Sequence, residues 1–274
     1  MTRRRNRNSS GISLKQGILC GMALLVFLGI GAGFVAWSFL QDKFDPVTNC
    51  PLENHVPYAK SQLVILVDVT DPLKPDVASR LRTMLENTIK AQKQGTLVEL
   101  YVLDDRISNY EREFQSCVPK RVEDASEFSD NARMVEANFK SKFQDKVDNA
   151  IERLINMDKS YERSPICEMI KEVALKSFST GQMPIKGDRK MIIVSDFMQH
   201  SPGQFSMYNN KKYTFDDFSH TAYGSVLTLN SSDFNIKGVE VKLLYTKTMT
   251  VRNANFWKEY FGAGKAFVDE PLPL

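Results

Sequence analysis

Histidine and cysteine are scarce in this chain of 274 residues, which holds three of the first and four of the second. The histidines are scattered, at His55, His200 and His220, and no cysteine–histidine spacing resembles a zinc site. A glycine-rich phosphate loop is also missing, because Gly262 and Gly264 follow an expected helix and do not join a strand to a helix. The sequence therefore argues against a zinc-binding module and a P-loop nucleotide site.

Acidic residues are absent from the first 41 positions, where five basic residues occur before Asp42: Arg3, Arg4, Arg5, Arg7 and Lys15. Removing these five from the 36 basic residues leaves 31 against 33 acidic ones, a net charge of −2. Binding to a phosphate backbone needs an excess of positive charge on the folded part. We therefore expect no nucleic-acid partner.

Residues 17–40 contain no charged side chain, and at ~1.5 Å per residue they are long enough to cross a ~30 Å hydrocarbon layer. The run is longer than the apolar region of a signal peptide and ends in bulky residues, including Trp37. We predict a transmembrane helix over 17–40 after a basic cytoplasmic tail, 1–16. The chain would then be a single-pass inner-membrane protein, with its C-terminal part periplasmic or otherwise extracytoplasmic.

The four cysteines differ in their expected surroundings. Cys20 falls in the apolar run, and Cys167 lies on a helix face with core character. Cys50 and Cys117 stand beside proline-bearing segments and would face an oxidising compartment. A disulfide between these two and a pair of free thiols are both compatible with the sequence.

The remaining chain divides into a proline-bearing segment without periodicity, 41–60, which we interpret as a linker, and an α/β domain, 61–274. Aliphatic runs and helical periodicity alternate along the domain. We expect strands over 63–69, 96–103, 190–197 and 238–246, and helices starting near Pro75, covering 135–154, starting at Ser164 and covering 253–261. This order predicts an open, mostly parallel sheet with helices on both faces.

An aromatic-rich segment, residues 200–236, lies between the last two expected strands. It is either a packing excursion of the domain or a partner-binding surface formed by its aromatic residues, Phe205, Tyr208, Tyr213, Phe215 and Tyr223.

Oxygen-bearing side chains follow two of the expected strands. Asp68 and Asp196 each end an aliphatic run, so both should lie at the same edge of the sheet, where ligands gather in such folds. Thr70 and Asp71 follow Asp68, and Ser164 is interpreted as the cap of a helix that begins at this edge. Carboxylates and hydroxyls together can hold a hard divalent cation such as Mg²⁺.

The stretches "ILVDVTDP", "RSPICEMI" and "IIVSDF" resemble the metal-ion-dependent adhesion site of von Willebrand factor A (vWA) domains. The resemblance implies a vWA/Rossmann-like fold and a metal site formed by Asp68, Thr70, Ser164 and Asp196, with Asp71 or one more water as a further ligand. It also implies a protein partner whose acidic side chain completes the coordination sphere. Pro72 departs from the pattern, because it stands where the family has a second serine and offers no ligand.

We therefore predict a membrane-anchored binding or scaffold module for a protein partner in a membrane-associated assembly, either with Mg²⁺ or without metal. The sequence does not indicate its oligomeric state. The alternative is a metal-dependent hydrolase of the phosphoesterase or nuclease type that uses Asp68, Asp196 and Asp104.

Overall fold

The computed structural model of the protein describes residues 22, 25, 27–31, 43–103, 112–126, 130–157, 160–179, 183–208, 213–230 and 234–274. The chain forms two compact units, residues 1–43 and 44–274. The predicted basic tail and most of the predicted transmembrane helix fall outside the described residues. Among the residues that are described, no helix has both the length and the apolar character that a membrane span requires.

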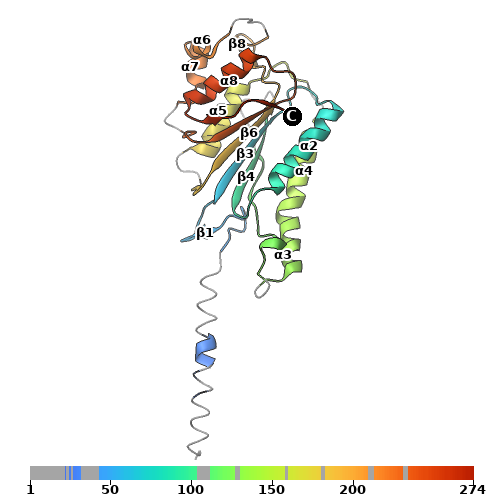
Figure 1. The fold of residues 1–274 in the computed structure, drawn as a ribbon, viewed down its shortest axis with the longest axis vertical. Helices are drawn as coiled ribbons and strands as arrows, with labels where there is room; N and C mark the ends of the chain where they lie inside the picture. Colours follow the sequence, from blue (N-terminus) through green and yellow to red (C-terminus); the bar gives the residue numbers. More distant parts are fainter. Residues whose placement is uncertain are drawn as a thin grey trace, which may run out of the picture. The chain divides into compact units, whose positions relative to one another are not determined.

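The larger unit is built on a mostly parallel sheet, as the sequence predicts (Figure 1). Its seven described strands follow the order β10-β9-β6-β3-β4-β5, with β11 also paired to β9. They are β3 (Ser61–Asp68), β4 (Thr96–Leu103), β5 (Arg112–Cys117), β6 (Arg189–Ser195), β9 (Glu240–Tyr245), β10 (Phe267–Val268) and β11 (Leu272–Pro273). The central strands β3, β4 and β6 are almost fully buried, and the continuous aliphatic runs of β3 and β6 predict this.

Strand β5 is not predicted from the sequence, because its residues "REFQSC" are mostly polar. It pairs antiparallel with β4 at the edge of the sheet. One polar residue on β4, Glu99, is only 1 % exposed, and it accepts hydrogen bonds from Arg112 Nη1 at 2.7 Å and Gln62 Nε2 at 2.7 Å. A buried carboxylate requires such partners, so the polar character of β5 serves the neighbouring strand.

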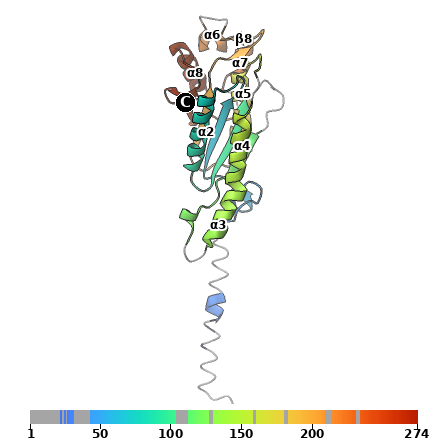
Figure 2. The ribbon, with the colours of Figure 1, turned by 90° about the vertical axis from the view of Figure 1, so that its right-hand side faces the viewer.

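Helices cover both faces of the sheet (Figures 1 and 2). One face carries α2 (Pro75–Lys90) and a long helical segment: α3 (Ala132–Phe139), the π-helical turn η2 (Lys140–Gln144) and α4 (Asp145–Ile155). The other face carries α5 (Ile166–Phe178), α7 (Ala222–Leu227) and α8 (Val251–Ala263). The apolar spacings that predicted α2 and α4 are the buried ones, with Val77, Leu81, Leu85, Ile89, Val147, Ile151 and Leu154 all in the core.

The aromatic segment between β6 and β9 forms the hairpin β7–β8 (His200–Ser201, Phe205–Ser206), α6 (Phe215–Ser219) and α7. Its rings pack on α8: the centroids of Phe205 and Phe218 lie 6.0 and 5.4 Å from that of Phe256. The other predicted aromatic residues are buried or half-buried except Tyr208, which is 51 % exposed. The structure thus favours the packing interpretation for this segment.

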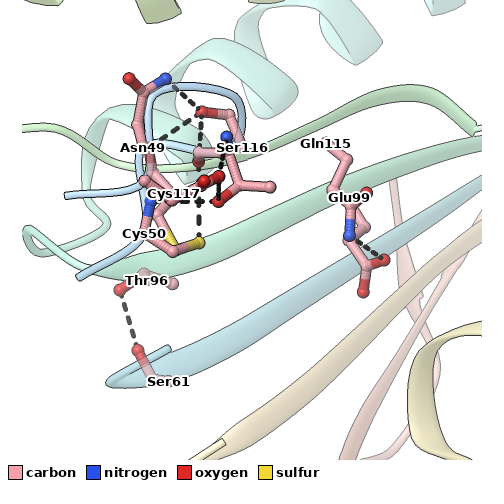
Figure 3. The surroundings of a disulfide bond; sticks show 10 residues. Asn49, Cys50, Ser61, Thr96, Glu99, Gln115, Ser116 and Cys117 are labelled. Atoms are coloured by element: carbon pink, nitrogen blue, oxygen red, sulfur yellow. Dashed lines mark hydrogen bonds between the residues drawn. A yellow bond between two sulfur atoms is a disulfide. The ribbon is translucent and has the colours of Figure 1, made fainter. Parts of the chain in front are cut away.

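The compact unit begins at Phe44, so most of the predicted linker packs on the domain. Residues 44–60 include the hairpin β1–β2 (Leu52–Glu53, Val56–Pro57). A disulfide joins Cys50 to Cys117 at the end of β5 (Figure 3). Beside it, Cys117 N donates to Thr48 O at 2.7 Å and Asn49 Nδ2 donates to Ser116 Oγ at 2.9 Å. Because Cys117 is opposite Leu97, the chain enters the domain at the amino ends of the parallel strands.

The disulfide closes a loop with a sequence separation of 67 residues, and a loop of that length restricts the unfolded chain by about 4 kcal/mol. We predict that replacing Cys50 and Cys117 together by serine lowers the free energy of unfolding by roughly 2–4 kcal/mol, measured by urea denaturation of the full chain in detergent. Reducing agent should destabilise the wild type equally and leave the double variant unchanged. An effect of reducing agent on the double variant would contradict this origin.

Candidate functional site

The predicted site residues meet where the order of the sheet reverses. Strand β3 lies between β4, which follows it in the chain, and β6, which comes later, after β5 and the helices α3, α4 and α5. Connections on the two sides of β3 therefore run in opposite directions, which opens a crevice at the carboxyl ends of β3 and β6. Asp68 is the last residue of β3, and Asp196 directly follows β6.

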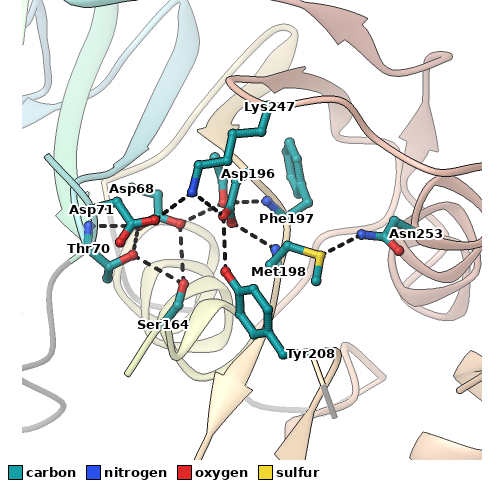
Figure 4. Close-up of polar contacts among 11 residues, drawn as sticks. Asp68, Thr70, Asp71, Ser164, Asp196, Phe197, Met198, Tyr208, Lys247 and Asn253 are labelled. Carbon is teal, nitrogen blue, oxygen red and sulfur yellow. Dashed lines mark hydrogen bonds and ion pairs between the residues drawn. The ribbon is translucent and has the colours of Figure 1, made fainter. Parts of the chain in front are cut away.

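Asp68 is buried and accepts hydrogen bonds on both carboxylate oxygens (Figure 4). Its Oδ1 accepts from Thr70 N at 3.0 Å and Thr70 Oγ1 at 2.6 Å. Its Oδ2 accepts from Ser195 Oγ at 2.7 Å and from Ser164 Oγ at 3.4 Å. One carboxylate thus links the end of β3, the end of β6 and the segment that precedes α5.

Ser164 is not the helix cap that the sequence suggests. The N-cap of α5 is Pro165, whose side chain makes no capping hydrogen bond. The buried amide of Gln199 replaces a cap, since its Oε1 accepts from Cys167 N at 2.7 Å. Because α5 is capped from elsewhere, the hydroxyl of Ser164 is available to the site, where it also lies 3.3 Å from Thr70 Oγ1.

Asp196 is held at the start of a strained turn. The next residue, Phe197, has φ of 58°, a left-handed conformation that is unfavourable for an aromatic residue. It is fixed by packing and a hydrogen bond. The centroids of its ring and of the Trp257 ring lie 5.7 Å apart, and its carbonyl accepts from Trp257 Nε1 at 3.0 Å. The sharp turn lets Asp196 Oδ1 accept from Met198 N at 2.9 Å while Oδ2 faces the site.

Lys247 is the main residue of the site that sequence reasoning missed. Its Nζ lies 2.6 Å from Asp71 Oδ2 and 3.1 Å from Asp196 Oδ2 (Figure 4). Tyr208 OH also donates to Asp196 Oδ2, at 3.3 Å. The sequence places Lys247 directly after the expected strand 238–246, but only the structure shows that this strand lies beside β6 and so brings Lys247 to the same edge of the sheet.

Burial and crowding of charge shift the pKa values at the site. Burial and, secondarily, the charge of Asp196 raise the pKa of Asp68 to about 6. Partial burial lowers the pKa of Lys247, but its hydrogen bond to Asp71 and its contact with Asp196 outweigh this and raise it overall. Burial and the charge of Asp196 raise the pKa of Tyr208 to about 12. Lys247 therefore stays protonated at neutral pH.

A pocket of about 350 Å³ opens over this cluster. Besides the cluster residues Asp68, Thr70, Asp71, Asp196 and Lys247, its walls include Pro72, Lys74, Asp76 and Arg80. Acidic and basic side chains are thus mixed around one opening. Such a lining matches a polar protein surface better than a polyanion.

The oxygen atoms of the cluster suit a hard cation by chemistry, but Lys247 occupies the place that faces Asp71 and Asp196. Pro72 contributes no ligand. Within the described residues, no group of three or more histidine, cysteine, aspartate or glutamate side chains is arranged to hold a metal ion. The site does not fit a divalent cation while Lys247 is in place. Asp104, which the hydrolase alternative needs, lies outside the described residues.

The raised pKa of Asp68 has a consequence for stability. Its folded-state pKa of about 6 lies above the ordinary value of 3.8, so folding stabilises the protonated form, and that stability is lost as the pH rises through about 6. We predict that Asp68→Asn stabilises the protein relative to wild type by on the order of 2–3 kcal/mol more at about pH 7.5 than at about pH 4. Urea denaturation of both proteins at the two pH values measures this difference. Parallel pH profiles would contradict an ionised, buried Asp68.

Comparisons with known proteins show only distant similarity. No protein-family model and no curated protein matches the chain. Among solved structures, the VWA domain of SpRpn10 is similar with a TM-score of 0.39 and 7% identity, over 79% of this chain and 90% of that one. The human COPII-coat protein Sec24c is similar with a TM-score of 0.38 and 11% identity, over 80% of this chain. This chain spans 30% of the length of the Sec24c chain.

Proposed function

We propose that this chain is a membrane-anchored, extracytoplasmic binding module of the vWA-like type. It uses the carboxyl edge of its sheet to hold a protein partner in a membrane-associated assembly. The observation that carries the proposal is the polar cluster of Asp68, Thr70, Ser164 and Asp196 at the point where the sheet order reverses. In folds of this kind, that point is where ligands bind.

The pocket favours a protein ligand over other classes. It is lined by both charge signs, with Asp71 and Asp76 beside Lys74 and Arg80. The exposed ring of Tyr208 stands next to this opening through its hydrogen bond to Asp196. Aromatic side chains with a polar tip and arginines are enriched in protein interfaces, whereas a nucleic acid would need a uniformly basic surface.

The proposed location rests on two features from different parts of the chain. The uncharged run 17–40 follows a basic tail, which favours an orientation with the tail in the cytoplasm. The disulfide between Cys50 and Cys117 supports an oxidising compartment for the domain. Together they support a single-pass inner-membrane protein whose domain lies outside the cytoplasm.

The anchor predicts a specific response to charge in the apolar run. An arginine at the centre of a membrane span costs about 2.5–3.5 kcal/mol, so replacing Leu25 and Leu28 together by arginine should release the protein from membranes washed with alkaline carbonate. Wild type should stay in the membrane pellet, measured by immunoblot. As a matched control, Val251→Arg changes a residue that is 77% exposed on α8 and should leave the distribution unchanged. Release of the wild type by carbonate would rule out a spanning anchor.

The partner-binding edge is tested by photo-crosslinking of the full chain in its host membrane. Lys74→benzoylphenylalanine puts the probe on the wall of the pocket, and Met134→benzoylphenylalanine puts it on α3, at a residue that is 64% exposed. We expect a heterologous protein adduct from position 74 and none from position 134. The same adducts from both positions, or adducts with the protein itself alone, would contradict partner binding at this edge of the sheet.

A further inference from the structure

We propose that the ammonium group of Lys247 takes the place of a divalent cation in the Asp68–Asp71–Asp196 cluster, so that the site carries a cation that is part of the chain. Its Nζ bridges two carboxylates from separate segments, Asp71 after β3 and Asp196 after β6, at 2.6 and 3.1 Å. The lysine is therefore a positioning residue for this edge of the sheet.

The backbone holds Lys247 in this position. Strand β9 pairs in parallel with β6, and its last residue, Tyr245, is opposite Ser195. One residue further, Thr246 N donates to Ser195 O at 3.0 Å, which extends the pairing to the residue before Lys247. A cation held this way is present at the site at any concentration of free metal.

The chemistry of the ammonium group suits this role. It has three donors and no acceptor, and two of its neighbours are carboxylates that lie at hydrogen-bonding distance. Asp196 has a side chain only 9% exposed, so it needs a compensating charge, whereas Asp71 at 52% does not. Lys247 itself is 57% exposed, so its charged head also remains in contact with solvent.

A divalent ion and Lys247 compete for the same oxygens. Magnesium binds oxygen ligands at ~2.0–2.1 Å in a nearly octahedral arrangement, and it would have to use Asp71 Oδ2 or Asp196 Oδ2, both of which contact Nζ. Pro72 has no side-chain oxygen, so it cannot supply a further ligand to an ion that displaces the lysine. The chain thus keeps the oxygen donors of a cation site while supplying its own positive charge.

Removal of Lys247 should then uncover a metal site. Asp71 and Asp196 would then face each other without a cation, and a hard divalent ion can bind through two carboxylates while water completes its coordination shell. Two carboxylates held close together repel each other when both are ionised, and a bound divalent cation relieves that repulsion. The role of Lys247 does not depend on a partner, so its test uses metal ions alone.

The experiment measures the melting temperature of the full chain in detergent with Mn²⁺, with Mg²⁺ and with EDTA, together with Mn²⁺ titration by calorimetry. We expect wild type to show no shift between EDTA and either ion. Lys247→Met should melt lower than wild type in EDTA and gain roughly 5–10 °C at a hundredfold excess of ion over Kd. Lys247→Gln, which keeps hydrogen-bond donors but no charge, should gain similarly and serves if the methionine variant does not fold.

Two controls separate the site from the surface. Lys190→Met removes a lysine of similar exposure from the other end of β6, where it pairs with Glu240 at 2.8 Å, and should create no response to ions. Adding Asp196→Asn to Lys247→Gln should abolish the response. A wild type that gains several degrees with Mn²⁺ or Mg²⁺, or folded Lys247 variants that bind no ion, would overturn the proposal.

Discussion

The burial of one carboxylate organises the carboxyl edge of this sheet. Asp68 ends the central strand β3 and receives hydrogen bonds from Thr70, Ser195 and Ser164, which belong to three different segments. A buried acid without such donors would cost several kcal/mol, so each segment is held to the position that supplies its donor. The loop after β3, the end of β6 and the start of α5 are arranged around the requirements of this side chain.

Two unfavourable features near Asp68, an α5 helix without a side-chain cap from Ser164 and a positive φ at Phe197, are compensated by neighbouring residues. Ser164 serves Asp68 and not the first turn of α5, and the buried amide of Gln199 satisfies the helix instead. Gln199 in turn donates to Glu168 Oε2 at 3.0 Å and Ser201 Oγ at 3.0 Å, so the substitute cap is itself fixed. The unfavourable φ of Phe197 is held by its packing against Trp257. Strain and buried polar groups that are fully supported in this way are common where a protein prepares a binding site.

The sequence predicts the parallel core of the fold because buried parallel strands are continuous aliphatic runs, as in β3 and β6. It also predicts that Asp68, Thr70, Ser164 and Asp196 meet, since carboxyl ends of parallel strands share an edge. It does not predict β5, where Arg112 donates a hydrogen bond to the buried Glu99 on β4, nor does it predict the role of Lys247. Both depend on pairing between segments far apart in the chain, and local pattern carries no information on such partners. Ser164 before Pro165 is the local pattern of a helix cap, and only the structure shows that its hydroxyl instead donates to Asp68.

The Cys50–Cys117 disulfide lies at the amino ends of the parallel strands and the polar cluster lies at their carboxyl ends, and this has a mechanical consequence. A partner pulling on the carboxyl edge, against the point where the chain enters the domain, would load β3 along its length. The hydrogen bonds from β3 to β4 and β6 would then resist in shear, all at once, and not open one after another. The disulfide passes part of the tension from the entering chain to β5 at the edge of the sheet. By this geometry, the sheet should resist stretching most strongly along the direction from the entry point of the chain to the carboxyl edge of the sheet.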